Sequence, residues 1–486
     1  MSFGFSRAPD TFTLASKENL QMIHDASLDV LEKTGVRMPS EKCLEVFEKA
    51  GCIVDHGQQI VRIPSYVVRE ALKKGKSIVR LYARNPKYNM SLDGRHVHVT
   101  ASGCNQYTID LETGEKRPSV TDDIVKAANI VNGLDSTHMF SPMVGSHDVS
   151  EHIRDVHDVK TALVSSEKNV GTEQGFNPNA VPYMIEIAAT ICGGSDELRR
   201  TPIITAYYCQ ISPLTFDGRS SEGALEFAGA GVPITYCPCP LMGASDPVTL
   251  AGSMVVSNAE NLAALVLIES AFPGTPFIYG SSIAPLDMRT TRRAGGAIEH
   301  GMTGSAMAQL GRYLGLPTFV GGFYTTANKP GAEACIDKIF CGLLSFSNVD
   351  ISEGTGLIED GKTLSFEQLV IDSELGEMFH RVARGIEFND VTLALDLIHK
   401  VKPGGTYLTE KHTNDYLRKE HFISNLVKRQ LYEVWVNDGS KDIVDLAREK
   451  AKKLAQSYPE KPLDKDLKEK IEEIMRRADK ELSKGN

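Results

Sequence analysis

From about residue 96 onward, short apolar segments alternate with longer segments in which apolar residues recur every three to four positions. Apolar runs of four to eight residues are typical of strands, and the three-to-four spacing is typical of helices that bury one face. Helix starts carry acidic and capping residues, as at Thr121, Asp122 and Asp123. The pattern predicts eight strands, at about 97–103, 139–144, 169–173, 203–209, 233–237, 276–280, 317–322 and 349–352.

Each predicted strand is followed by a predicted helix, up to about residue 400. Strict alternation with apolar strands is typical of a parallel sheet that is buried on both faces. Eight such pairs favour an α/β fold, a closed TIM (β/α)8 barrel over residues 96–400. An open doubly wound sheet is the alternative, and it usually has a glycine-rich phosphate turn after an early strand, which this sequence lacks.

The segments on either side of the predicted barrel follow a different pattern. Residues 1–95 mix short helices and strands, beginning with a helix over 16–35 that Ser16 can cap, and predict an N-terminal α+β cap. Residues 401–486 begin with a Pro/Gly break and predict a C-terminal helical extension. The mixed charges of the last helix favour packing on the barrel or on another subunit over membrane binding. Its apolar face is formed by Leu463, Leu467, Ile471, Ile474, Met475, Ala478 and Leu482.

Composition narrows the classes of function. The 486 residues carry a formal net charge of −10, which disfavours a surface built to bind nucleic acid or an anionic membrane. The sequence has no run of 18 apolar residues and no pattern of a secretory signal at its N-terminus. The nine cysteines are odd in number and scattered, which is typical of reduced thiols. We therefore expect a cytoplasmic protein with neither nucleic-acid nor membrane partners.

Barrel enzymes carry their working residues just after the C-terminal ends of the strands. In this sequence those positions are rich in aromatic rings and poor in acids. Rings with one or two carboxylates suit a quaternary ammonium, which has no N–H donor and is bound through ring quadrupoles and its diffuse charge. Rings that merely fill the barrel mouth are the alternative. The residues concerned are Phe176, Tyr207, Tyr208, Tyr236, Tyr279, Phe323 and Tyr324, with Asp148, Glu173 and Glu353 as the acids.

Metal, nucleophilic and nucleotide chemistry have weaker support. His147, His152 and His157 recur every five residues, so successive histidines lie about 140° apart on a helix and do not share a face. Cys237 and Cys239 are too close for a zinc half-site, which leaves a reactive thiol as an alternative to buried structural cysteines. No nucleophile elbow and no Walker sequence occur. We expect no tightly bound metal or nucleotide in this chain.

Three stretches together resemble the trimethylamine methyltransferase superfamily. The first is 110–119, followed by Asp122 or Asp123 and a helix; the second is 295–299 ahead of 309–317. The third is 404–413 followed by 432–435. Their order and spacing are more specific than any one of them, and the similarity covers roughly residues 15–460.

The resemblance implies a TIM barrel that passes a methyl group from an amine to the Co(I) of a separate corrinoid protein. The founding members carry pyrrolysine near the end of the seventh strand, whereas the corresponding stretch here, 325–333, holds only standard residues. This difference points to the pyrrolysine-free branch, whose substrates are quaternary amines such as glycine betaine, proline betaine and carnitine. Demethylating a quaternary ammonium expels a neutral amine, so no general acid is needed to protonate the leaving group.

The sequence-based hypothesis is a corrinoid-dependent quaternary amine methyltransferase that works as a homo-oligomer. Its cobalamin or other corrinoid is carried by a cognate partner protein. In this hypothesis Glu173 and Glu353 balance the substrate charge, and Asn105 and Gln174 bond a substrate carboxylate or hydroxyl. The cage around the ammonium is formed by Tyr207, Tyr279, Phe323 and Tyr324.

Two alternatives remain open from the sequence. A barrel lyase or decarboxylase of small acids needs an arginine at a strand end, and Arg289, Arg292 and Arg293 follow the sixth strand. A non-catalytic betaine-binding or scaffold protein is the second.

Overall fold

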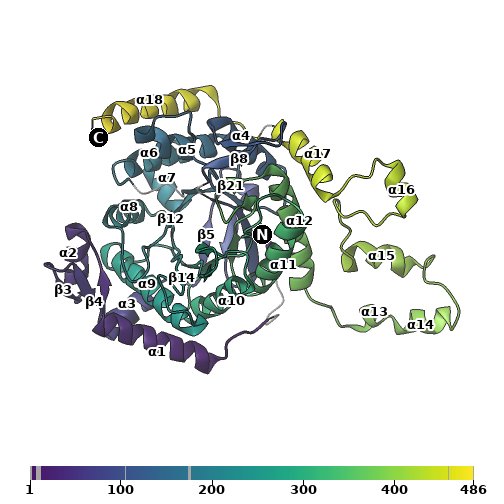
Figure 1. Ribbon diagram of the computed structural model, residues 1–486, viewed down its shortest axis with the longest axis horizontal. Coiled ribbons are helices and arrows are strands. Elements are labelled where there is room, and N and C mark those ends of the chain that lie inside the picture. The colour runs from purple at the N-terminus through teal and green to yellow at the C-terminus, as the bar shows by residue number, and fades with distance from the viewer. Residues whose placement is uncertain (1–2, 7–11, 104, 173–176, 458, 485–486) are drawn as a thin grey trace.

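Eight parallel strands close into a barrel at the centre of the molecule (Figure 1). The computed structural model describes residues 3–6, 12–103, 105–172, 177–457 and 459–484. The barrel closes where β19 pairs in parallel with β7, with Glu353 opposite Thr100. The predicted TIM barrel is therefore confirmed. Its strands are β7 (His96–Ala101), β10 (Met139–Phe140), β11 (Asn169–Thr172), β12 (Ile204–Tyr208), β13 (Ile234–Tyr236), β15 (Phe277–Ser281), β18 (Thr318–Gly321) and β19 (Ile351–Glu353).

Helices surround the barrel and cover the outer face of its strands (Figure 1). Because the strands are covered on both faces, nearly all of their residues are buried, including polar ones such as His98 and Asn169. The helices are α4 (Thr121–Asn132), α5 (Glu151–Ser165), α6 (Val181–Cys192), α7 (Ser195–Arg200), α8 (Gly218–Gly229), α9 (Leu250–Ala271), α10 (Ile298–Tyr313), α11 (Ala332–Phe346) and α12 (Phe366–Ala383).

One helix in the described part of the chain, α9, is long and apolar enough to cross a membrane by length and composition. Its most apolar window is 78% buried inside the protein. Helices from the N-terminal region pack along it. A helix that is apolar all round is expected where neighbours cover every face, so burial in the core accounts for the composition of α9.

The N-terminal region combines three helices with short antiparallel pairs. Ser16 caps α1 by accepting a hydrogen bond from the backbone N–H of Asn19, as predicted. The β5–β6 hairpin places Leu81 and Leu92 in the same apolar cluster as Ile278 and Phe319, so it closes the N-terminal end of the barrel. The elements are β1 (Phe5–Ser6), α1 (Lys17–Lys33), β2 (Val36–Arg37), α2 (Glu41–Lys49), β3 (Ile53–Asp55), β4 (Ile60–Arg62), α3 (Ser65–Lys74), β5 (Val79–Leu81), a 3-10 turn (Pro86–Tyr88) and β6 (Met90–Leu92).

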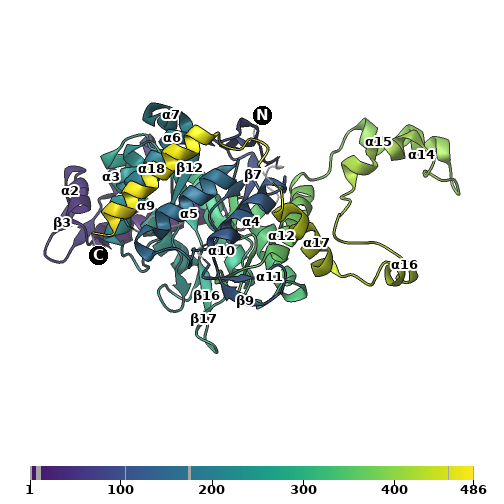
Figure 2. The same cartoon turned by 90° about the horizontal axis from the view of Figure 1, so that it is seen from above.

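Short strands decorate the opposite end, where the barrel strands finish. Figure 2 shows β9, β16 and β17 together at this end, which we call the mouth. β16 and β17 form an antiparallel hairpin, with Leu286 opposite Arg293. The mouth strands are β8 (Tyr107–Ile109), β9 (Lys116–Pro118), β14 (Leu241–Met242), β16 (Ala284–Asp287), β17 (Arg292–Arg293), β20 (Leu357–Ile358) and β21 (Thr363–Leu364).

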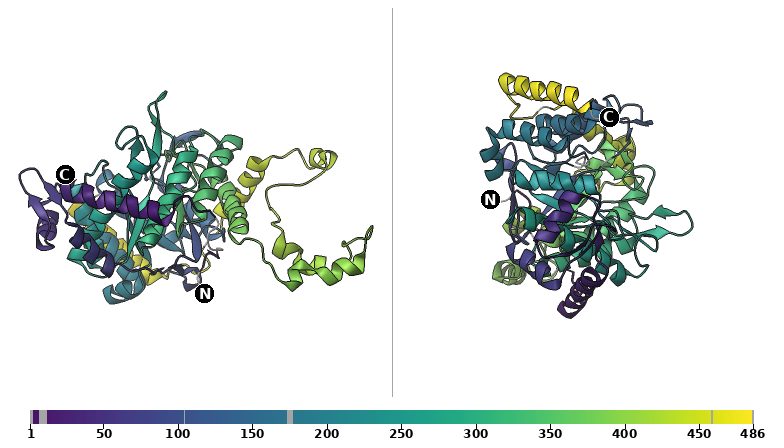
Figure 3. Two further views of the ribbon diagram at one scale, coloured as in Figure 1. Left: turned by 90° about the horizontal axis from the view of Figure 1, so that it is seen from below. Right: turned by 90° about the vertical axis from the view of Figure 1, so that its left-hand side faces the viewer.

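The C-terminal region first leaves the body and then returns to it. Residues 385–441 project from the flank of the barrel (Figures 1 and 3). They contain α13 (Asp390–Leu393), α14 (Leu395–Val401), α15 (Lys411–Glu420) and α16 (Tyr432–Asn437). The chain then forms α17 (Ile443–Ala455) and α18 (Lys465–Leu482). α18 packs on α5 and α6 with Ile471, Ile474 and Met475 buried, which confirms that its apolar face covers the barrel.

Candidate active site at the barrel mouth

Two aromatic rings meet at a tilted angle inside the barrel. Tyr207 and Phe319 come from β12 and β18, and their ring centroids are 5.3 Å apart at an interplanar angle of 53°. Phe319 is 3% exposed, whereas Tyr207 is partly exposed. Burial, reinforced by neighbouring thiols and the Glu353 carboxylate, raises the pKa of Tyr207 well above its usual value. The phenol therefore stays neutral at physiological pH.

The carboxylate of Glu353 lies at the end of β19, close enough to Tyr207 to raise the pKa of its phenol. It is 2% exposed and accepts hydrogen bonds from Ser102 Oγ and from Tyr324 Oη, each 3.2 Å long. Gly354 follows with φ of 105°, a left-handed conformation that lets the chain turn away directly after the carboxylate. Glu353 is thus held at the barrel axis side of its strand, where it can face a bound cation.

Arg293 in the β16–β17 hairpin makes polar contacts that link this hairpin to the loop after β19. Its Nη1 donates to Asp360 Oδ1 at 2.6 Å and its Nη2 donates to Ser282 Oγ at 2.9 Å. The guanidinium carbon also lies 4.8 Å from the ring centre of Tyr324, so one face of that ring is covered by a cation. The two exposed arginines of this segment stand apart: Arg289 pairs with Asp287 of its own turn, and Arg292 is solvent-exposed.

Three cysteines gather on the same interior wall. Cys209 and Cys239 bring their Sγ atoms to 3.6 Å and are partly exposed, whereas Cys237 is buried. Hydrogen bonding to Cys209 and Cys237 holds the pKa of the Cys239 thiol well below its usual value. The same contacts and burial raise the pKa of Cys209 and Cys237. Cys239 is therefore the thiol of this group that ionises first.

Two of the four residues predicted to form the cage point away from the barrel interior. Tyr279 donates from its hydroxyl to Asn258 Oδ1 of α9 at 2.9 Å, and its side chain is 1% exposed between β15 and the helices. Phe323 is fully buried against Phe379 of α12, with ring centroids 5.6 Å apart. The expectation that these two rings converge over one cation is therefore not met; both fill the layer between strands and helices.

Asn105 lies at the mouth beyond β7 and is 1% exposed. Its Nδ2 donates to the backbone oxygen of Met143 at 2.7 Å, which fixes the orientation of the amide. Its buried Oδ1 has no hydrogen-bond partner among the described residues. The spare atom is an acceptor, so it suits a hydroxyl or an N–H group better than a carboxylate. Two further predicted site residues, Glu173 and Gln174, lie outside the described residues.

The histidines that recur along α5 and its preceding loop have separate partners. His152 pairs with Asp479 of α18 at 2.7 Å, and His157 Nε2 lies 3.1 Å from Thr121 Oγ1. His147 Nδ1 lies 3.3 Å from Ser119 Oγ. Among the described residues, no group of three His, Cys, Asp or Glu side chains is arranged to hold a metal ion.

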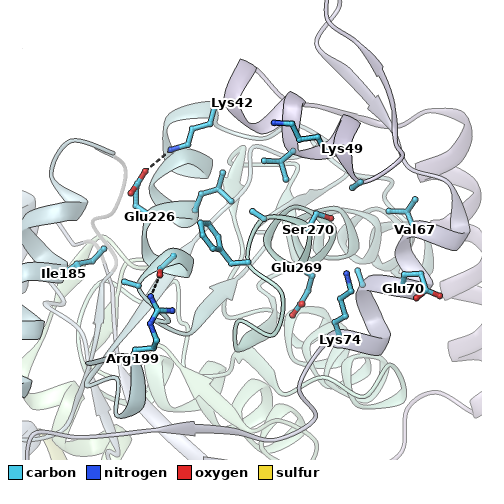
Figure 4. A pocket seen from close by; sticks show the side chains of 18 of the residues that line it. Lys42, Lys49, Val67, Glu70, Lys74, Ile185, Arg199, Glu226, Glu269 and Ser270 are labelled. Carbon is cyan, nitrogen blue, oxygen red and sulfur yellow. Dashed lines mark hydrogen bonds and ion pairs between the residues drawn. The ribbon is translucent and has the colours of Figure 1, made fainter. Parts of the chain in front are cut away.

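A groove of about 880 Å³ lies elsewhere, between the N-terminal region and the barrel helices (Figure 4). Lys42 spans one side of it with an ion pair to Glu226 of 2.8 Å, and Phe272 lines it just beyond the C-terminal end of α9. The barrel helices run opposite to the strands, so their C-terminal ends lie at the end of the barrel where the strands begin. Catalysis in TIM barrels takes place at the other end, which leaves the mouth as the candidate site.

Sequence reasoning did not identify Phe319 as a neighbour of Tyr207, or Ser102 and Cys209 as neighbours of Glu353. Phe319 lies within a strand rather than just after one, so a search of strand ends passes over it. The sequence does not show which side chains of a strand point into the barrel. Once Tyr207 is known to face inward, Cys209 is expected to face inward too, because side chains alternate along a strand with a period of two.

Comparisons with known proteins find matches that cover nearly the whole chain. The family model described as Trimethylamine methyltransferase (MTTB) matches residues 5–483. The chain is 32% identical over 469 residues to the trimethylamine methyltransferase of Desulfitobacterium hafniense strain DCB-2, covering 96% of this chain and 94% of that protein. It is 26% identical over 475 residues to the glycine betaine methyltransferase of strain Y51, covering 97% and 98%. The monomethylamine methyltransferase structure from Methanosarcina barkeri aligns at 13% identity with a TM-score of 0.48, covering 94% of this chain and 96% of that one.

Proposed function

The chain belongs to the trimethylamine methyltransferase family, and we propose that it transfers a methyl group from a quaternary amine of the betaine type to the Co(I) of a corrinoid on a separate protein. The relatives are named for trimethylamine and for glycine betaine, so a methylated amine is the shared substrate class. The observation that carries the proposal is the buried Glu353 carboxylate beside the rings of Tyr207 and Tyr324.

The chemistry of this wall fits a methylated ammonium. A quaternary ammonium has no hydrogen to donate, so it is held by diffuse attraction to a carboxylate and to ring faces. Glu353 supplies the charge, and the Tyr207–Phe319 pair supplies an apolar aromatic surface beside it. One face of Tyr324 already carries Arg293, so we place Tyr324 as a residue that orients Glu353 through its hydroxyl.

The bond that breaks is the one between nitrogen and the methyl carbon. Its electron pair stays on nitrogen, so a quaternary amine leaves as a neutral tertiary amine and requires no proton. The corrinoid supplies the nucleophile that accepts the methyl group. The chain's own task is to hold one N–CH3 bond pointing outward through the mouth and to keep water from the cation. Tyr207 remains a neutral phenol throughout, because its pKa is raised.

The described residues fit a corrinoid that is brought from outside. The donor set at the mouth is a carboxylate, phenols and thiols that contact one another, and none of it forms a metal-binding group. We infer that the rim formed by the β16–β17 hairpin and the β8–β9 hairpin receives the cofactor-bearing face of the partner. We also infer a cytoplasmic location.

The polar part of the substrate remains a matter of proposal. Within the part of the chain that the structure describes, the buried Oδ1 of Asn105 is unpaired, which favours a substrate that carries a hydroxyl group, as carnitine does. Glu173 and Gln174 stay in the hypothesis as a second acid and a second amide. The loop over 325–333, built from standard residues, supports a substrate whose demethylation does not need the family's special residue.

Trimethylamine is the second candidate substrate, because the relatives of 32% identity are named for it. The alternative of a lyase for small acids has less support: Arg293 is engaged by Asp360 and Ser282, which leaves it less available to grip a substrate carboxylate.

Calorimetric titration tests the cation site directly. We expect glycine betaine, proline betaine or carnitine to bind, and the carbon isostere of glycine betaine, 3,3-dimethylbutanoate, to bind at least about tenfold more weakly than glycine betaine if that is the substrate. The isostere keeps shape and carboxylate but lacks the positive charge. Equal affinity for glycine betaine and its isostere would contradict a cation site built on Glu353.

A further inference from the structure

Residues 385–441, which we call the arm, stand clear of the rest of the molecule (Figures 1 and 2). The range 384–446 is described in full, and Leu426 is the only buried residue in it. The four arm helices have between four and ten residues each and make no core of their own. Isolated helices of this length are marginal in water. The arm therefore needs a surface to pack on.

The arm is also unusually apolar for an exposed segment. Five of its large side chains are at least 70% exposed: Ile386, Phe388, Leu408, Leu431 and Tyr432. Soluble monomers seldom expose so many large apolar groups in one segment, and such segments mark protein–protein contacts. Burying this surface is worth about 25 cal/mol for each Å² removed from water.

Polar contacts fix the base of the arm to the barrel. Glu374 Oε1 on α12 accepts hydrogen bonds from Ser424 Oγ at 2.5 Å and from the backbone N–H of Asn425 at 2.7 Å. Arg381 Nε donates to the backbone oxygen of Glu420 at 2.7 Å. The arm is thus attached at a defined point beside α12 and projects from it.

A second unpartnered apolar surface lies on the neighbouring barrel helix. On α11, Ile336, Ile339 and Phe340 are 59%, 37% and 55% exposed and share one face at three-to-four spacing. α11 packs directly on α12, from which the arm departs. The chain therefore displays both an apolar arm and an apolar helix face on the same flank.

We propose that the arm of one copy packs on the α11 face of a second copy, and that two such contacts close a two-fold dimer. A two-fold axis makes the contact reciprocal, so one interface covers both apolar surfaces on each chain.

The direction of the arm separates this partner from the corrinoid protein. In Figure 2, α14 and α15 lie beyond the flank of the barrel, displaced toward the end away from β16 and β17, which mark the mouth. These helices therefore do not form part of the mouth rim. The arm contains both acidic and basic residues in similar numbers, so it presents no single charge for a charged partner to recognise.

Sedimentation velocity of the full-length chain between about 1 and 50 µM tests the proposal. We expect the wild type to be at least a dimer, and Leu408→Glu in the arm and Phe340→Glu on α11 each to lower the assembly toward the monomer. Ile53→Glu is the matched control, since Ile53 is 62% exposed on β3, on the far side of the molecule. It should leave the mass unchanged. Circular dichroism checks that every variant folds.

Mixing the two variants makes the test specific. The Phe340→Glu chain keeps an unaltered arm, and the Leu408→Glu chain keeps an unaltered α11 face. In an equimolar mixture the first can pack its arm on the second, so we expect a heterodimer, whereas neither variant should dimerise alone. Trp435, the only tryptophan in the sequence, lies in α16 and reports on the arm by its emission. Its emission should shift to longer wavelength on dilution.

A wild type that sediments as a monomer at 50 µM would overturn the proposal. So would folded variants that keep the wild-type mass, or a mixture that stays monomeric. Binding of the arm to a corrinoid protein, with no self-association, would assign the arm to the other partner. None of these measurements depends on methyl transfer, so failure of the proposed function would leave this result readable.

Discussion

The rings of Tyr207 and Phe319 lie 5.3 Å apart inside the barrel, although the two residues are more than 100 positions apart in the chain. Their strands are separated by β13 and β15 around the wall, so the contact crosses the barrel interior. It forms an aromatic surface beside Glu353, whose carboxylate contributes to the raised pKa of Tyr207. This is the surface on which we place the methylated nitrogen.

Replacing Tyr207 or Phe319 by Leu removes the ring but keeps much of the apolar volume. We expect each change to weaken binding of the quaternary amine by about 0.5–2 kcal/mol, or roughly two- to thirtyfold. Calorimetric titration measures the loss, and thermal melts check the fold. Phe323→Leu is the control, because Phe323 packs on Phe379 outside the barrel. It should lower the melting temperature and leave affinity unaltered; a larger affinity loss in the control would restore Phe323 to the cage.

Glu353→Gln removes the negative charge and keeps the shape of the side chain. We expect affinity for the quaternary amine to fall roughly tenfold or more, since the cation would lose its buried counter-charge. Binding of 3,3-dimethylbutanoate should stay level or improve. Glu359→Gln is a matched control, as Glu359 pairs with Lys116 at the mouth surface. Unchanged betaine affinity in Glu353→Gln would show that another group balances the charge.

Cys239 should react with iodoacetamide before the other thiols. Its pKa is lowered, so at any given pH a larger share of it is ionised than of a thiol with an ordinary pKa, and its rate should rise less steeply between pH 6.5 and 8.5. Cys335 is the comparison: it is also partly exposed, but burial raises its pKa to about 11, and its rate should rise with pH. Peptide mass spectrometry follows both. Bound substrate should protect Cys239, because this thiol lies on the proposed binding wall.

The burial of Glu260 should make the folding stability of the protein depend on pH. It is buried on α9, and burial raises its pKa to about 8 while it accepts hydrogen bonds from Ser212 and Leu214 in the loop after β12. The folded state therefore holds this proton up to about pH 8, whereas the unfolded chain releases it near 4.3. The stabilising effect is complete below about pH 4 and is lost as pH rises to 8, by at most about 1.4 kcal/mol per pH unit.

The measurement compares wild type with Glu260→Gln, which mimics the protonated form. The melting temperature of the wild type should fall relative to the variant between pH 5 and 8. The surface variant Glu226→Gln should show no such trend, since Glu226 is exposed and paired with Lys42. Parallel curves for Glu260→Gln and wild type would mean that Glu260 ionises with an ordinary pKa.

The barrel could be predicted from the sequence because the strand–helix alternation is regular from one end of it to the other. The cage could not, and β15 shows why. Ile278 faces the interior, and Tyr279 faces α9, yet both are apolar and fully buried. A strand covered on both faces gives no polar side by which to tell inward from outward positions. Tyr207 and Tyr208 present the same ambiguity on β12, and the structure separates them.

The arm illustrates a second limit of prediction from the sequence. The sequence pattern indicated helices near 390–400 and beyond 401, and helices are found there. Residues such as Phe388 and Leu408 look in the sequence like any buried apolar residue, so apolarity alone suggests that they pack on the barrel. Whether such a face is covered by the same chain depends on tertiary position, which local pattern does not encode.

The central claim is that this chain demethylates a quaternary amine. The most direct measurement is methyl transfer to cob(I)alamin, followed by the appearance of methylcobalamin, with glycine betaine, proline betaine, carnitine and trimethylamine tested in turn. We predict methylcobalamin from at least one quaternary amine, none from trimethylamine, and a strongly reduced yield with Glu353→Gln. Turnover of trimethylamine alone would contradict the account.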